Sequence, residues 1–313
     1  MKIIMKQPKG DTRNPAAVYI HTSSLVLMTV LSLAGNSLVC MAFYRNRRLR
    51  KATNFYVLSL SISALIITTF GYPFLAIASG LRKWPFSAKV CQFNGFLTYY
   101  ISGVSLSILA LTAINRYVRV VKPQRYPVLF TKNKTVFSIV FVWLFTLTVG
   151  LTATLVTPVS FQWNHRTLIC TMTKNKLSAN RVLYFAFVIV ILLPLVTILF
   201  CYGSVYRSIR RHNAAVNPSL QTANHHRTVD THDIRACRVL AATVSGFCLC
   251  WSPMIVISIL RKVGQFHVSA FWMSLIVLAA ASSSWINPIL YGLMNRAMRK
   301  EFLKILRCHQ NQN

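Results

Sequence analysis

The sequence predicts an all-α membrane protein, a bundle of seven transmembrane helices followed by a short amphipathic helix. Of the 313 residues, 54% are hydrophobic and only 12% are charged, about half the charged share of an average soluble domain. Seven apolar runs are long enough to cross a bilayer, which takes about 20 residues of helix. The cations cluster between these runs, as the loops of a membrane protein require.

Each apolar run is expected to form one helix. Pro73, Pro194, Pro253 and Pro288 fall inside the runs, and membrane helices tolerate proline because neighbouring groups satisfy the freed backbone. In chain order the expected spans are Val18–Tyr44, Asn54–Ser79, Ala88–Val121, Val136–Thr157, Asn180–Tyr206, Ile234–Leu260 and Ala270–Leu293.

Seven spans place the two termini on opposite sides of the membrane. More of the 35 Lys and Arg residues lie on the side that holds the first, third and fifth connections and the tail, and this side is predicted to be cytoplasmic. We therefore expect an extracellular N-terminus over residues 1–17 and a transmembrane domain over 18–293 in the plasma membrane. Residues 294–313 are expected to form an interfacial helix and a short cytoplasmic tail.

The tail sequence "NRAMRKEFLKILRC" has the pattern of a helix that lies in the membrane surface. Met298, Phe302, Ile305 and Leu306 recur at helical spacing, with Arg and Lys between them, so the lipid bilayer is an expected partner. Cys308 is a candidate for palmitoylation, and a free tail cysteine is the alternative.

The four acids leave little room for catalysis. They are Asp11, Asp230, Asp233 and Glu301, with none between residues 12 and 229. Carboxylate catalysis and carboxylate metal sites therefore lack residues, and the apolar runs hold none of the carboxylates that ion-coupled transporters use. We expect neither an enzyme nor a cofactor. The net charge of +31 does not indicate a nucleic-acid partner, because the cations do not line one face of a domain.

Short motifs on six of the seven spans resemble those of the rhodopsin-type (class A) G-protein-coupled receptors. They occur in the order and on the helices that the family requires, which makes the match specific. They are Gly35–Asn36, the "NRY" of Asn115–Arg116–Tyr117, Trp143, Pro194 with Tyr202, the "CWSP" of Cys250–Pro253 and the "NPILY" of Asn287–Pro288 to Tyr291.

The resemblance implies roles for these residues. Arg116 would hold the inactive state against the sixth helix and then move to the G protein, and Asp233 is a candidate partner; a solvated loop acid is the alternative for Asp233. Tyr202 and Tyr291 would close the active state through a water, and Trp251, beside Pro253, would switch rotamer below the ligand. Cys91 and Cys170 match the family's disulfide between the third helix and the second outer loop.

Two acids of the family pattern are missing. Asn115 replaces the acid before the arginine, and Ala64 replaces the aspartate midway along the second helix. With Ser105, Ser283, Ser284 and Asn287 that aspartate would hold sodium, and hydroxyls and an amide alone bind a hard cation poorly. We therefore predict no sodium effect, and appreciable basal signalling because the inactive state is less restrained.

The expected ligand pocket lies between the outer halves of the helices. Thr98 stands where amine receptors carry an aspartate, and Ala281 stands where opsins carry the retinal lysine, so an amine or retinal ligand is not expected. Tyr99, Ser102 and Trp251 complete the candidate pocket. Within this family the sequence resembles the melatonin receptors, which share "AINRY", although the residues that contact their ligand are not matched here. A peptide, lipid or anionic ligand is the other possibility.

The sequence thus predicts a receptor that transduces an unknown extracellular ligand to a heterotrimeric G protein. The melatonin-like features favour the inhibitory class of G protein. The alternative is a receptor-like protein that no longer signals and acts through heteromerisation; the two missing acids leave it open, and the intact "NRY" and "NPILY" motifs argue against it.

Overall fold

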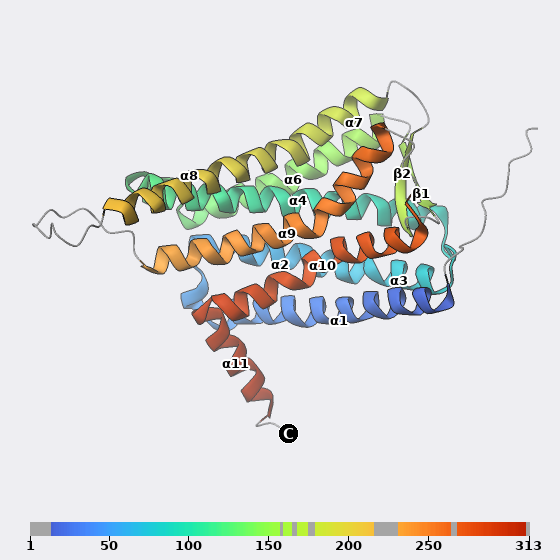
Figure 1. The fold of residues 1–313 in the computed structure, drawn as a ribbon. Coiled ribbons are helices and arrows are strands. Elements are labelled where there is room, and N and C mark those ends of the chain that lie inside the picture. The colour runs from blue at the N-terminus through green and yellow to red at the C-terminus, as the bar shows by residue number, and fades with distance from the viewer. Residues whose placement is uncertain are drawn as a thin grey trace, which may run out of the picture.

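The computed structural model describes residues 14–156, 159–164, 168–174, 179–215, 231–263 and 268–310, and it confirms the predicted seven-helix bundle (Figure 1). Six helical segments are long and apolar enough to cross a membrane, and Ala241–Ile257 supplies a shorter apolar stretch in the seventh. The spanning helices are α1 (Pro15–Arg45), α2 (Ala52–Phe70) with α3 (Tyr72–Gly80), α4 (Ala88–Val121), α6 (Lys132–Val156), α7 (Ala179–Phe187) with α8 (Leu193–Ala215), α9 (Thr231–Val263) and α10 (Ala270–Met294).

Several helices extend beyond the apolar runs that predict them. The bounds of α4 match the expected span, whereas α6 begins at Lys132, four residues before the predicted Val136, and α8 continues beyond Tyr206 to Ala215. Apolarity marks where a helix enters the membrane, but the backbone hydrogen bonds continue past that level into polar sequence.

The second and fifth spans are interrupted next to their prolines. The second span breaks at Gly71, two residues before Pro73, and Asn94 of α4 donates its amide to the Gly71 carbonyl at 3.0 Å. In the fifth span a π-helical segment, η3 (Val188–Leu192), immediately precedes α8 and its Pro194. The first irregularity is satisfied by a side chain of α4, and the second lies against the same helix, where Val190 approaches Gly103.

A β-hairpin covers the end of α4 near Cys91, which we call the outer end, and this segment was expected only as a loop. Its strands are β1 (Val159–Asn164) and β2 (Ile169–Lys174), paired antiparallel with Trp163 opposite Cys170. Gly95 of α4 packs so closely on Phe161 that a Cβ at residue 95 would overlap the ring. The hairpin therefore depends on both a disulfide and a glycine contact with α4.

After α10 the chain continues as α11 (Arg296–Gln310), which turns away from the bundle (Figure 1). The four apolar residues of α11 were expected to share one face toward the membrane surface. Met298 and Ile305 are instead buried against the bundle and Phe302 is partly buried there, whereas Leu306 is 53% exposed and lies off that face. The loops at the opposite end from the hairpin, which we call the inner end, contain η1 (Arg47–Leu49), η2 (Pro123–Arg125) and α5 (Tyr126–Leu129).

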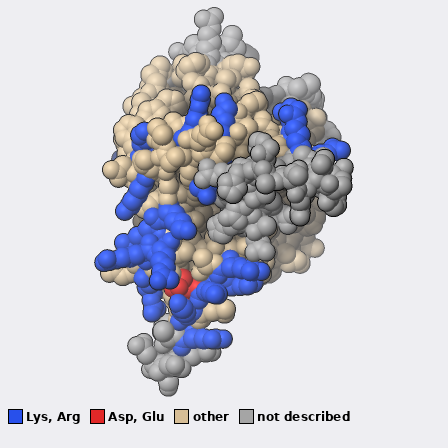
Figure 2. Space-filling view, turned by 90° about the vertical axis from the view of Figure 1, so that its left-hand side faces the viewer, with Lys and Arg blue, Asp and Glu red and all other residues tan. Residues whose placement is uncertain are grey.

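Many lysines and arginines lie at the end of the bundle where α1 and α8 finish (Figure 2). The sides of the bundle expose large apolar residues, among them Phe137, Leu155, Leu199 and Leu249. Exposed apolar residues of this kind suit contact with acyl chains rather than water.

Candidate functional site

The inner end of α4 buries the polar residues of the "NRY" motif. Asn115 is fully buried and Arg116 is 5% exposed. Tyr117 packs against Phe200 of α8, with ring centroids 5.8 Å apart. Burying a guanidinium costs free energy unless polar groups surround it. The motif therefore places a buried positive charge where α4 meets the neighbouring helices.

Asn115 is part of a three-residue hydrogen-bond network. Thr53 of α2 donates to its Oδ1 at 3.3 Å, and its Nδ2 donates to the hydroxyl of Tyr126 at 3.4 Å. The hydroxyls of Thr53 and Tyr126 lie 3.2 Å apart. An amide can both donate and accept, so Asn115 connects α2, α4 and the inner loop without a negative charge.

The inner loop is also held from the α4 side. The guanidinium carbon of Arg119 lies 4.7 Å from the ring centroid of Tyr126, within the range of a cation–π interaction. Neither Thr53 nor Tyr126 was expected from the sequence to belong to the site. The one feature of the sequence that could have indicated the network is that Tyr126 follows the "NRY" motif closely along the chain.

The switch residues of α10 pack against α1, α2 and α11. Tyr291 is 1% exposed, in an apolar cluster with Phe43, Leu49 and Met298. Pro288 contacts Gly35 so closely that a Cβ at Gly35 would lie 2.8 Å from the proline Cβ. Asn287, like Pro288, is buried.

The structure does not place Tyr202 in the same apolar cluster as Tyr291. Tyr202 packs against the central cluster that contains Tyr56 and Leu109. The backbone of Asp233 lies in the first turn of α9, but its side chain, like that of Cys308, lies outside the described part of the chain. The roles that the resemblance gives to these residues remain predictions.

Trp251 joins α9 to α10 near the middle of the bundle. Its indole N–H donates to Ser283 at 3.2 Å, and its ring stacks on Phe247 with centroids 5.8 Å apart. Pro253 lies inside the same helix, two residues further on. The tryptophan is therefore placed beside a proline where a change in its rotamer would alter the contact between the two helices.

The position of the missing aspartate is filled by packing and hydroxyl groups. Ala64 is 5% exposed, and Ser63 lies 3.1 Å from Ser105 between the hydroxyl oxygens. Ser283 and Ser284 each donate to a carbonyl of their own helix at 2.8 Å. Neutral hydroxyls whose protons point to the backbone are a poor ligand set for sodium.

The candidate pocket residues fall into two environments. Thr98 and Ser102 are partly buried and bond to their own helix, at 2.8 and 2.6 Å respectively, whereas Tyr99 is half exposed and its ring lies 5.6 Å from that of Phe161. Ala281 is 6% exposed within an apolar cluster, and its carbonyl accepts from Tyr72 at 3.3 Å. The hairpin therefore brings Phe161 to the candidate pocket, a residue that the sequence did not indicate.

Cys91 and Cys170 form the disulfide that the resemblance implied. It connects the first turn of α4 to β2 and is buried with Phe161. An outer aromatic group covers it, in which Trp84 and Trp163 lie 5.3 Å apart between ring centroids.

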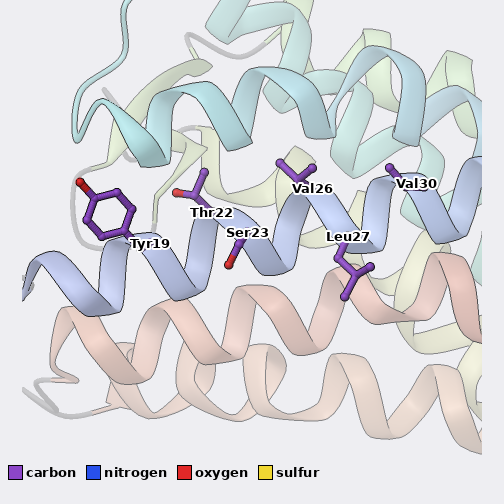
Figure 3. A pocket seen from close by; sticks show the side chains of 6 residues that line it. All are labelled: Tyr19, Thr22, Ser23, Val26, Leu27 and Val30. Atoms are coloured by element: carbon purple, nitrogen blue, oxygen red, sulfur yellow. The ribbon is translucent and has the colours of Figure 1, made fainter.

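A separate groove of about 540 Å³ runs along the outward face of α1 (Figure 3). Four of its six lining residues are large and at least half exposed, from 50% at Val26 to 76% at Tyr19. It is wide open and belongs to the apolar side of the bundle, away from the candidate pocket residues. The lining residues are Tyr19, Thr22, Ser23, Val26, Leu27 and Val30.

Comparison with known proteins agrees with this arrangement. The histamine H2 receptor of Cavia porcellus is 28% identical over 292 residues, which are 91% of this chain and 78% of the receptor. The melatonin receptor type 1B-B of Danio rerio is also 28% identical, over 306 residues that are 95% of this chain and 84% of the receptor. Equal identity to receptors for different ligands does not single out a ligand for this chain.

The crystal structure of squid rhodopsin has the same fold, with a TM-score of 0.79 at 19% identity over 95% of this chain and 89% of that one. The family model of the 7 transmembrane receptor (rhodopsin family) matches residues 35–291. That range runs from the glycine that packs on Pro288 to the buried Tyr291. The chain therefore belongs to the rhodopsin family of seven-transmembrane receptors, the class A G-protein-coupled receptors.

Proposed function

We propose that this receptor has an extracellular N-terminus and transmits the binding of an extracellular ligand to a heterotrimeric G protein, of which the inhibitory class is favoured. The observation that carries the proposal is the inner end of α4, where Arg116 is 5% exposed beside a satisfied polar network. A protein that kept this helix only for packing would not need a buried cation there, because buried charge is costly.

The ligand is proposed not to depend on an amine counter-ion. Thr98 is partly buried and its hydroxyl donates to the carbonyl of Asn94, and residues 12–229 contain no acid. The name of the histamine H2 receptor therefore does not transfer its ligand to this chain. A ligand with hydrogen-bonding and aromatic groups suits Ser102, Tyr99 and Phe161 better, because Phe161 brings a ring next to Tyr99.

The proposed division of the chain is an outer segment over 1–17, a transmembrane domain over 18–293 and an interfacial helix with its tail over 294–313. Cys308 remains the proposed palmitoylation site, because it lies one turn after Lys304 on a helix with exposed leucines. A lipid there would attach the end of α11 to the bilayer.

The experiment that tests the function is G-protein dissociation in cells at matched surface expression. We expect basal dissociation above that of untransfected cells, and we expect Arg116→Ala to change it severalfold. Lys83→Ala, which removes an exposed cation between α3 and α4 at the other end of the bundle, is the matched control and should leave the signal unchanged. Each G-protein class is assayed separately, and a preference for a class other than the inhibitory one would correct that part of the proposal.

The second candidate is a receptor-like partner that acts through heteromerisation. The observation in its favour is the loss of two family acids, at Asn115 and Ala64. A chain that reaches the surface, shows no dissociation for any G-protein class and is unaffected by Arg116→Ala across amines, indoles, peptides and lipids would favour this candidate over signalling.

A further inference from the structure

One edge of the inner face carries six exposed cations from two distant parts of the sequence. We call it the basic inner edge. Figure 2 shows lysines and arginines gathered toward the lower end of this face, around a small acidic area. The six residues are Arg47, Arg48 and Lys51, from η1 and the residue before α2, and Arg296, Arg299 and Lys300, from the first half of α11.

A common core holds the two halves of this edge together. Leu49 of η1 and Met298 and Ile305 of α11 are buried in one cluster, and Tyr291 of α10 belongs to the same cluster. The backbone of each basic segment is therefore fixed relative to the other. Six like charges held side by side repel one another, and an anion between them would relieve that repulsion.

The neighbouring charged side chains are already engaged within the protein. Arg50 donates to the carbonyls of Phe43 and Tyr44 at 3.1 and 2.7 Å, and so completes the end of α1. Glu301, 9% exposed, pairs with Lys304 at 3.2 Å. Within the described residues, no comparable hydrogen bond or ion pair occupies the six side chains of the basic inner edge.

The start of α11 adds to the positive potential. Its first turn contains no acid, although helix N-termini carry partial positive charge and favour anions. Cations are least favourable near the N-terminus of a helix, and this is where Arg296, Arg299 and Lys300 lie. A bound phosphate would therefore stabilise this end of α11 more strongly.

Apolar side chains next to these cations point to a lipid rather than a soluble anion. Leu303 is 48% exposed and Leu306 is 53% exposed on α11. Exposed leucines between lysines and arginines are typical of a helix whose apolar residues enter the acyl region while its cations meet headgroups.

We propose that the basic inner edge binds anionic phospholipid headgroups of the inner leaflet. A headgroup that bridges η1 and α11 would stabilise the docking of α11 on the bundle and the burial of Tyr291 behind it. Lipid composition would thereby act on one of the proposed switch residues. The proposal uses the inner placement of this end, but it does not depend on which ligand or G protein the receptor uses.

The test is native mass spectrometry of the detergent-purified full chain with phosphatidylserine and phosphatidylcholine of the same acyl length. Each cation near the surface is expected to contribute about a fivefold preference for the anionic lipid. We therefore expect at least about tenfold more phosphatidylserine than phosphatidylcholine adducts. Replacing Arg47, Arg48, Arg299 and Lys300 together by Gln should bring the two lipids to equal binding.

The matched control replaces four other inner cations, Arg125, Arg207, Arg210 and Arg211, by Gln and should keep the preference. A variant with Arg47→Lys, Arg48→Lys and Arg299→Lys keeps the charge and should bind like the original chain, which separates charge from misfolding. Phosphatidylserine should also raise the thermal midpoint of the original chain more than that of the four-Gln variant.

Three outcomes would overturn the proposal. The original chain could bind both lipids equally, or the control and the four-Gln variant could lose the preference for phosphatidylserine equally. Full competition of lipid binding by soluble inositol phosphates would indicate a free polyanion instead of a lipid. The measurement contains no ligand and no G protein. Its failure would therefore leave the proposed signalling function untouched.

Discussion

The inner end of α4 and the middle of α2 each lack an acid that the family pattern carries, and the structure accommodates the two losses differently. At the inner end Asn115 keeps hydrogen bonds to Thr53 and Tyr126, at 3.3 and 3.4 Å. In the middle of the bundle Ala64 keeps only packing, and the nearby serines bond to each other or to backbone.

The difference separates two properties of the missing acid, its hydrogen bonds and its negative charge. An amide reproduces the shape and the connections of the carboxylate but not its charge. A methyl group reproduces neither, so the surrounding polar groups must turn to one another. The network around Asn115 should therefore tolerate a restored charge, and the site around Ala64 should respond to one strongly.

The largest effect is expected for Ala64→Asp. A carboxylate at this buried position has no cation among its described neighbours, so the substitution should cost about 3–5 kcal/mol in a buffer that contains only a bulky organic cation. Sodium should restore much of that loss, because the carboxylate completes a set of oxygen ligands with Ser105 and Ser283. The measurement is the thermal midpoint of the purified receptor in sodium and in choline salts.

The control for this substitution is Ala64→Asn, which has nearly the same size without the charge. It should lower the midpoint less and show no response to sodium. The original chain should have the same midpoint in both salts, and a clear rise with sodium there would contradict the interpretation of the serine network.

The next largest effect is expected for Asn115→Ala. Both hydrogen bonds of the amide are lost in a buried site, at a cost of about 1–3 kcal/mol. The inner loop loses its connection to α4, so basal G-protein dissociation should rise. Thr148→Ala, on the exposed side of α6, is the control, and an unchanged midpoint for Asn115→Ala would argue against the network.

A smaller loss is expected for Tyr126→Phe, about 1 kcal/mol, because one hydroxyl is removed and Arg119 keeps a ring to stack on. The informative quantity is its coupling to Asn115→Ala. Since the two side chains touch, the double variant should lose less than the sum of the two single losses, by about 0.5 kcal/mol or more. Strictly additive midpoint shifts would mean that the 3.4 Å contact contributes nothing.

The smallest change in stability is expected for Asn115→Asp. The carboxylate can accept hydrogen bonds from both Thr53 and Tyr126, and it places a negative charge beside Arg116, so its gains offset much of its burial cost. Basal dissociation should fall relative to the original chain. A rise in basal signal would show that charge at this position does not restrain the inactive state.

The sequence by itself determined the fold class, the number of spans and the family. Bilayer thickness sets the length of each apolar run, and motifs such as "NRY" and "NPILY" keep a fixed order along the chain. The Cys91–Cys170 pairing followed from the resemblance and is confirmed.

Only the tertiary structure decided the contacts between distant segments. The Thr53, Asn115 and Tyr126 network joins three elements, and the burial of Phe161 against Gly95 requires a hairpin that apolarity does not reveal, because its strands are short and mixed in character. The basic inner edge likewise brings together residues near 48 and near 299. The physical reason is that periodicity and composition record how each helix meets the membrane, whereas hydrogen bonds and charge between helices depend on which faces the packed bundle brings together.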